Sequence, residues 1–255
     1  MRYALLLFAL PVLAERMTIP LRDPSRPAHL KFTTVNGSII VKPHAGREVI
    51  IDSDAPLPSA KPAPNGMKRI DLGRGGVTIE EENNVVTIKP GHLSGNSYTV
   101  LVPAASSVNL KSVNAKEIRV EGLDGEVNAD TVNGVITLVD VSGPVVAHAL
   151  NGRLKVTMTR VPEAKPMSFS TLNGRIDVTL PSATKADLKL SSQHGDIYSY
   201  FDVQVSPTVT RTESGRGDGP KYKLKFDRTV TGKINGGGAE ISFRTLNGPI
   251  YIHKK

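Results

Sequence analysis

The chain of 255 residues contains no cysteine and no tryptophan, and aromatic residues make up only 5% of it. The absence of cysteine excludes disulfides, thiolate zinc sites, iron–sulfur clusters and a cysteine nucleophile. No segment longer than a turn or two repeats its apolar residues at the helical period. What remains is 39% hydrophobic and 22% charged, with 23 glycines and 18 prolines, which is typical of a folded chain with many tight turns.

Residues 1–14 have the pattern of a secretory signal peptide. Arg2 supplies a positive charge, apolar residues follow from Tyr3 to Leu13, and Ala14 is a small residue suited to cleavage. The apolar run is shorter than the roughly 20 residues that a membrane span needs, and no later segment is longer. We therefore expect export to the periplasm or the extracellular space, and a mature chain, 15–255, without a transmembrane segment.

A three-residue element, valine or leucine followed by asparagine and glycine, recurs along the mature chain. Its five clear copies end at Gly37, Gly134, Gly152, Gly174 and Gly248. Degenerate copies occupy residues 113–115 and 193–195, and half-repeats end at Gly125 and Gly143. From Gly125 to Gly152 the spacing is nine residues each time, which indicates a repeat architecture.

Apolar residues keep fixed positions around each of the five glycines. They stand two before it, two after it and four after it, as with Val132, Ile136 and Leu138 around Gly134. Side chains of a strand alternate between its faces, so three positions of equal parity should share one face. We expect all three sets to line one buried interior, with Ile136, Leu154 and Ile176 stacked in a column.

Two architectures can use these turns. Asn-Gly between apolar strands is a strong hairpin signal, which allows an antiparallel sandwich. The regular half-period favours instead an all-β solenoid, with stacked coils of about 18–22 residues. We expect one elongated domain over 15–255, with surface excursions near 52–66 and 211–220. Val77–Pro90 is interpreted as two strands joined at Asn83-Asn84.

Four stretches carry a family resemblance: 108–114, 130–136, 170–181 (Ser-Thr-Leu-Asn-Gly-Arg-Ile-Asp-Val-Thr-Leu-Pro) and 232–238. Over roughly residues 30–255 the chain resembles the bacterial putative-adhesin family of β-strand-repeat envelope proteins. That resemblance implies a flattened, toast-rack β-solenoid and an exported bacterial protein. It implies no catalytic residue. The degenerate copies at 113–115 and 193–195 depart from the motif, so their corners are expected to differ.

No column of acidic residues suited to acid–base catalysis is evident in the repeat. Asp177, Asp187, Asp196 and Asp202 fall on different parities or corners. We therefore expect no enzymatic activity, no cofactor and no metal site, and a scaffold or adhesin-like module of the cell envelope. The alternative is a solenoid-fold carbohydrate-active enzyme, a polysaccharide lyase or hydrolase. An envelope-stress sensor that caps a signalling partner is a third hypothesis.

Aromatic residues near the C-terminus occupy matching repeat positions. Tyr198 and Tyr251 stand three residues after their glycines, and Tyr200 and His253 stand five after. If those coils are neighbours, the four rings form an outward strip that binds sugar rings or an envelope protein. The alternative is that they seal the end of the solenoid or pack under the loop near 211–220.

Lys221, Lys223 and Lys225 alternate with Tyr222, Leu224 and Phe226, which predicts a strand with one cationic face. In an exported protein this face could meet anionic envelope polymers or lipid head groups. A row of solvated lysines that protects a sheet edge is the alternative. A nucleic-acid partner is not expected, because the chain carries an export signal and no recognition motif.

Overall fold

The structure is a computed structural model that describes residues 15–54, 77–91, 95–163, 165–207 and 229–255. The predicted signal peptide, Lys221, Lys223 and Lys225, and nearly all of both predicted excursions lie outside these ranges. Strand β3 includes Asp52 and Ser53, so these two residues of the first predicted excursion belong to the sheet instead. No described segment is a helix with the length and apolarity that crossing a membrane requires.

The expected all-β fold is confirmed for the described residues, which form one large sheet of strands. Its members are β1 (Glu15–Ile19), β2 (His29–His44), β3 (Val49–Ser53), β4 (Val77–Glu82), β5 (Val85–Pro90), β6 (Ser97–Pro103), β7 (Ser107–Glu121), β8 (Val127–Val141), β9 (Val145–Asn151), β10 (Leu154–Met158), β11 (Met167–Asn173), β12 (Ile176–Leu180), β13 (Ala186–His194), β14 (Ile197–Ser199), β15 (Gln204–Pro207), β16 (Thr229–Ile234), β17 (Ala239–Asn247) and β18 (Ile250–Lys254).

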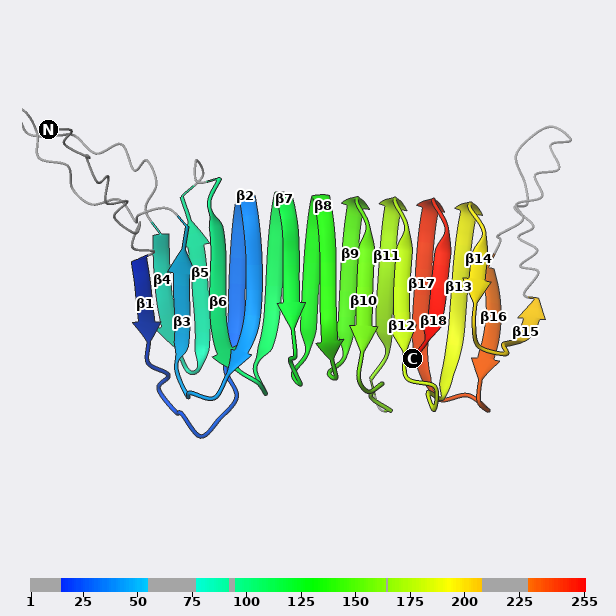
Figure 1. The fold of residues 1–255 in the computed structure, drawn as a ribbon, viewed down its shortest axis with the longest axis horizontal. Helices are drawn as coiled ribbons and strands as arrows, with labels where there is room; N and C mark the ends of the chain where they lie inside the picture. The colour runs from blue at the N-terminus through cyan, green and yellow to red at the C-terminus, as the bar shows by residue number, and fades with distance from the viewer. Residues whose placement is uncertain (1–14, 55–76, 92–94, 164, 208–228) are drawn as a thin grey trace, which may run out of the picture.

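The pairings separate this sheet into two rows that share their longest strands (Figure 1). The first row runs β4–β5–β2–β7–β8–β9–β11–β17–β13–β16–β15. The second row runs β1–β3–β6–β2–β7–β8–β10–β12–β18–β14. Strands β2, β7 and β8 bend at their asparagine and belong to both rows. We call a first-row strand plus the second-row strand that follows its corner a coil.

Neighbouring coils pair in parallel, in register. Asn133 pairs with Asn151 in the first row, and Leu154 pairs with Ile176 in the second. The Asn-Gly elements are therefore corners between the rows, and the antiparallel sandwich interpretation was wrong for them. One expected hairpin is confirmed: β4 and β5 pair antiparallel around Asn83 and Asn84, both with positive φ.

Two coils are displaced from chain order (Figure 1). Strand β2 lies between β5–β6 and β7, although it precedes both in sequence. Strands β17 and β18 lie between β11–β12 and β13–β14. The last coil of the sequence therefore sits one place inside the end of the stack.

The core lies between the rows and confirms two of the three expected apolar columns. Residues two and four positions after the corner glycines are 0–1% exposed. These are Ile39, Ile136, Leu154, Ile176 and Ile250, then Val41, Leu138, Val156, Val178 and Ile252. The third column was wrong, because residues two positions before the glycine point outward and Val132, Leu150 and Leu172 are 36–38% exposed.

The corner itself explains this error. Before the turn, the buried positions are three and five residues ahead of the glycine, as with Thr171 and Phe169 ahead of Gly174. Thr171 and Ile176 are both buried but five residues apart, so the corner shifts the alternation by one residue. The Thr171 hydroxyl donates to the carbonyl of Gly152, 3.2 Å away in the neighbouring coil, which satisfies a buried corner group.

An asparagine ladder follows the corners along the stack. Every side-chain amide after the first, Asn36, donates to the Oδ1 of the asparagine in the neighbouring coil, over 2.6–3.2 Å. The ladder joins Asn36, Asn114, Asn133, Asn151, Asn173 and Asn247. Stacked asparagines of this kind stabilise parallel in-register strands.

The degenerate copy at 113–115 departs from the other corners as expected. Ala115 replaces the glycine, and the pairing of β7 with both neighbours shifts register immediately after it. An extra residue in β7 before Ile118 produces this bulge, which lets a residue with a Cβ occupy the corner.

Candidate binding surface

The structure brings together the four predicted aromatic residues on the outer face of the second row. Strand β18 pairs with β14, and Tyr251 stands in register with Tyr198. Tyr200 follows β14 directly, and its backbone N–H donates to the Ile252 carbonyl, beside His253. We call Tyr198, Tyr200, Tyr251 and His253 the aromatic patch.

The rings of the aromatic patch stack along the row. Tyr198 and Tyr251 have centroids 5.0 Å apart and are inclined by 14°. Arg175 directly precedes β12, on the other side of β18, and its guanidinium carbon lies 4.2 Å from the centroid of Tyr251. Both faces of Tyr251 are therefore covered. Tyr200 lies 5.5 Å from His253 at a tilt of 36°.

A charged pair at the start of β12 fixes the inner edge of the patch. The Arg175 guanidinium donates to Asp177, and the other Asp177 carboxylate oxygen lies 2.8 Å from His253 Nε2. Asp177 is in register with Tyr251, so one carboxylate holds both the arginine above that ring and the adjacent imidazole. This arrangement pre-orders the patch before any ligand arrives.

The exposed part of the patch is its outer edge, on the terminal strand of the second row. Tyr198 is 50% exposed and Tyr200 is 75% exposed. The Tyr198 hydroxyl donates to Asp196 over 3.2 Å, and this bond with the nearby negative charge raises the pKa of the Tyr198 phenol. The phenol therefore remains a hydrogen-bond donor at neutral pH, beside an exposed carboxylate that accepts.

Two supporting residues were missed from the sequence, Arg175 and Asp177. Asp177 was considered only as an isolated acid, because it precedes Tyr251 by more than 70 residues. The displaced position of β17–β18 makes them neighbours. Asp177 and Tyr251 each stand three residues after their corner glycine, Gly174 and Gly248. This match, together with the coil order, is the signal that could have identified the two supporting residues.

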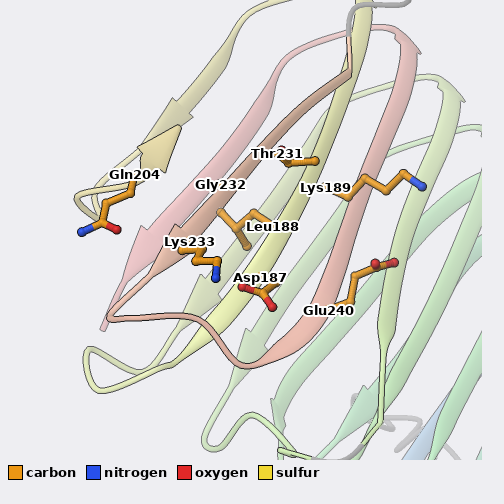
Figure 2. Close-up of a pocket in the computed structure, with 8 residues that line it drawn as sticks. All are labelled: Asp187, Leu188, Lys189, Gln204, Thr231, Gly232, Lys233 and Glu240. Carbon is orange, nitrogen blue, oxygen red and sulfur yellow. The ribbon is translucent and has the colours of Figure 1, made fainter. Parts of the chain in front are cut away.

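A second surface feature is an open hollow of about 340 Å³ where β13, β15, β16 and β17 meet. Its lining mixes charges of both signs: Asp187 on β13 is in register with Lys233 on β16 and with Glu240 on β17 (Figure 2). One oxygen of Asp187 is buried without a hydrogen-bond partner. Within the described ranges, no group of three or more histidine, aspartate or glutamate side chains is placed to hold a metal ion. No aromatic residue lines the hollow, so the aromatic patch is the stronger candidate.

Comparison with solved structures finds two similar chains. A "putative cell adhesion protein" from Clostridium sporogenes is 12% identical, with a TM-score of 0.48, over 95% of this chain and 100% of its own. A "putative adhesin" from Bacteroides fragilis is 9% identical, with a TM-score of 0.45, over 94% of this chain and 96% of its own. Neither a family model nor a curated protein sequence matches this chain.

Proposed function

We propose that this chain is an adhesin-like, non-enzymatic binding module of the bacterial cell envelope, which uses the aromatic patch to bind a glycan. The export pattern of residues 1–14 supports a periplasmic or extracellular location. We further propose that the two rows form a toast-rack β-solenoid, in which stacked coils act as a stiff scaffold for the patch.

The exposure of Tyr198 and Tyr200 carries the binding proposal. Large aromatic rings are costly to leave in water, and these two lie on the last strand of their row at 50% and 75% exposure. The outer face of Tyr198 points away from Tyr251, so within the described part of the chain the ring stack has an open end. The apolar C–H face of a sugar ring extends such a stack, while its hydroxyls reach the Tyr198 phenol and Asp196.

A binding assay tests this function. Residues 15–255 are titrated with soluble peptidoglycan fragments and envelope polysaccharides by calorimetry. We expect Y198A and Y200A each to weaken binding about tenfold, which corresponds to about 1.4 kcal/mol. V146A, on the opposite outer face, is the matched control and should bind like the unaltered chain.

Two results would contradict the proposal. Equal affinity of Y198A, Y200A and the unaltered chain would remove the patch as the site. Release of reducing or unsaturated sugars from the same polysaccharides would favour the carbohydrate-active enzyme instead. Binding affinity and sugar release are both measured on the same set of samples.

Export is tested separately, by fractionating cells that express the full chain with a C-terminal tag. We expect the protein outside the cytoplasm, with an N-terminus that begins at Glu15 by mass spectrometry. An intact Met1 in the cytoplasmic fraction would contradict the localisation without affecting the binding result.

A further inference from the structure

The outer face of the first row carries an apolar column that no part of the described chain covers. It consists of the residues two positions before each corner, on β2, β7, β8, β9, β11 and β17: Val35, Val113, Val132, Leu150, Leu172 and Leu246. Four of them are 36–42% exposed, and the other two are partly buried. A continuous aliphatic column on a flat face is typical of an interaction surface. It lies on the side of the core opposite the aromatic patch.

Charged residues stand beside this column, and their order differs when the row is followed from one end or the other. The residues four positions before each corner pair across the row in the order Thr33, Lys111, Asp130, His148, Ser170, Arg244, Ser191. Asp130 on β8 is the one acid in this set, and Arg244 on β17 lies three strands further along. The strand boundary midway between them is that of β9 and β11.

A second copy of the chain matches this pattern. A two-fold axis parallel to the strands, above the β9–β11 boundary, places the same columns face to face with the coil order reversed. Leu150 of one copy then faces Leu172 of the other, and Val132 faces Leu246. Asp130 faces Arg244, and the symmetry makes this pair twice. Moving the axis by half a strand, onto β9, places Lys111 against Arg244 and brings like charges together.

The size of the shared face is sufficient for a stable pair. Six strands of each copy, β7, β8, β9, β11, β17 and β13, face the same six strands of the other, at about 4.8 Å per strand and about 3.3 Å per residue over seven residues. The footprint is roughly 660 Å² per copy, or about 1,300 Å² in total, within the range of about 1,200–2,000 Å² for specific interfaces.

We infer that two copies of this chain associate face to face through the outer surfaces of their first rows, with their coil orders antiparallel. This goes beyond the proposed glycan binding, which uses the opposite face. The pair carries one aromatic patch toward each end, both directed away from the interface.

Sedimentation velocity on residues 15–255 tests the association. We expect a dimer at micromolar concentration, and a monomer for L150K, which places an unpaired charge at the centre of the apolar column. T157K introduces the same residue on β10, on the opposite face of the same coil, and should remain dimeric. Both variants should keep the melting temperature of the unaltered chain within a few degrees. A monomeric unaltered chain at 100-fold higher concentration, or a dimeric L150K, would overturn the inference.

A charge exchange tests the antiparallel register. D130R and R244D should each weaken the dimer at least tenfold, because each sets like charges against one another twice. The double variant D130R/R244D should recover to within about threefold of the unaltered chain. If the double variant is as weak as the single ones, the register is wrong. Glycan affinity should stay unchanged in all three, so loss of the dimer and loss of the proposed function are distinguishable.

A cross-linking experiment gives a second reading, because the chain has no native cysteine. An equimolar mixture of V132C and L246C should be joined by a short bismaleimide into a heterodimer. Neither variant alone should cross-link, since each cysteine faces the other position. Equal cross-linking of V132C alone would overturn the antiparallel arrangement.

Discussion

The middle of the stack and its two ends are built differently. From β7 to β12 the coils follow one another in chain order, and their pairing is parallel throughout. At one end β1, β3 and β4 pair antiparallel, and at the other β15 and β16 do so. Each end also contains one coil displaced inward. The repeat therefore specifies how one coil stacks on the next, whereas each end requires strands of another direction to limit growth.

The corner glycines express this difference most strongly. In the middle, a Cβ on Gly152 would lie 1.7 Å from the carbonyl oxygen of Gly134 in the neighbouring coil. Near the first end, a Cβ on Gly95 would have no neighbour within 4 Å. The stacked corner at Gly152 excludes a side chain, because adjacent backbones approach there to hydrogen-bonding distance.

The largest effect is therefore expected for G152A. The overlap is with the backbone of Gly134, so the two coils must separate, and we expect a loss of more than about 4 kcal/mol of unfolding free energy, or no folded protein. G95A, the matched change at the end, should cost less than about 0.5 kcal/mol. Denaturant unfolding of the purified variants measures both. Similar losses for the two would mean that the stacked corners are no tighter than the ends.

The same comparison shows what the sequence could predict. The columns after each corner follow from the repeat, and Leu154 and Ile176 are buried in register as expected. The alternation of buried and exposed residues after the corner does not predict which residues are buried before it, because the turn shifts the alternation by one residue. Thr171 rather than Leu172 is therefore buried. The buried position three residues before the glycine is threonine in four of the five clear copies and Ala149 in the other, so it looks polar in the sequence. The coil order was also beyond reach, since equivalent corners stack equally well in any order.

The aromatic patch illustrates both the strength and the limit of the repeat. Matching positions after Gly195 and Gly248 predicted that Tyr198 would meet Tyr251 if the coils were neighbours, and they are. Arg175 and Asp177 escaped because β12 becomes the other neighbour of β18 only through the displaced coil. Long-range order of this kind depends on which chain segment completes the stack.

Core aromatic residues should show the next largest difference in stability between the interior of the stack and its end. Phe243 on β17 is fully buried and stacks on Phe169 of β11 with centroids 5.3 Å apart, with a coil on each side. Phe201 is 7% exposed near the end, with the Lys254 ammonium 5.8 Å above its ring. F243A should cost about 3–5 kcal/mol and F201A about half as much, because the end relaxes around the cavity. Equal losses by denaturant unfolding would mean that the end is packed as firmly as the middle.

The asparagine ladder offers a smaller contrast. Asn151 donates to Asn133 and accepts from Asn173, whereas Asn36 only accepts, from Asn114. N151A removes two hydrogen bonds and should lower the unfolding free energy by about 1–2 kcal/mol. N36A removes one and should cost about half as much. The ladder would be irrelevant to stability if both variants melted with the unaltered chain.

The smallest expected effect is on the pH dependence of stability, and it distinguishes the two halves of the stack. Burial, with a contribution from Lys31, lowers the pKa of His29 below its usual 6.5. Hydrogen bonds from Lys165 and Asn128 lower the pKa of Glu126 below 4.5. Both groups bind more protons unfolded than folded in acid, so their stabilising contribution is complete at neutral pH. It is lost as the pH falls, below about 6.5 for His29 and below about 4.5 for Glu126.

His29 therefore accounts for the first loss of stability as the pH falls, and it lies in the half of the stack that contains β2 and β8. We expect the melting temperature of the unaltered chain to fall by a few degrees between pH 7.5 and 5.5, and that of H29N to fall less. The control is H148N: His148 lies on the outer face of the first row, where its Nδ1 is 2.8 Å from the Ser170 hydroxyl, and this variant shows what the loss of another imidazole does. If the melting temperatures of H29N and the unaltered chain fall equally between pH 7.5 and 5.5, acid destabilises the two halves of the stack alike. The difference between the halves is then confined to packing.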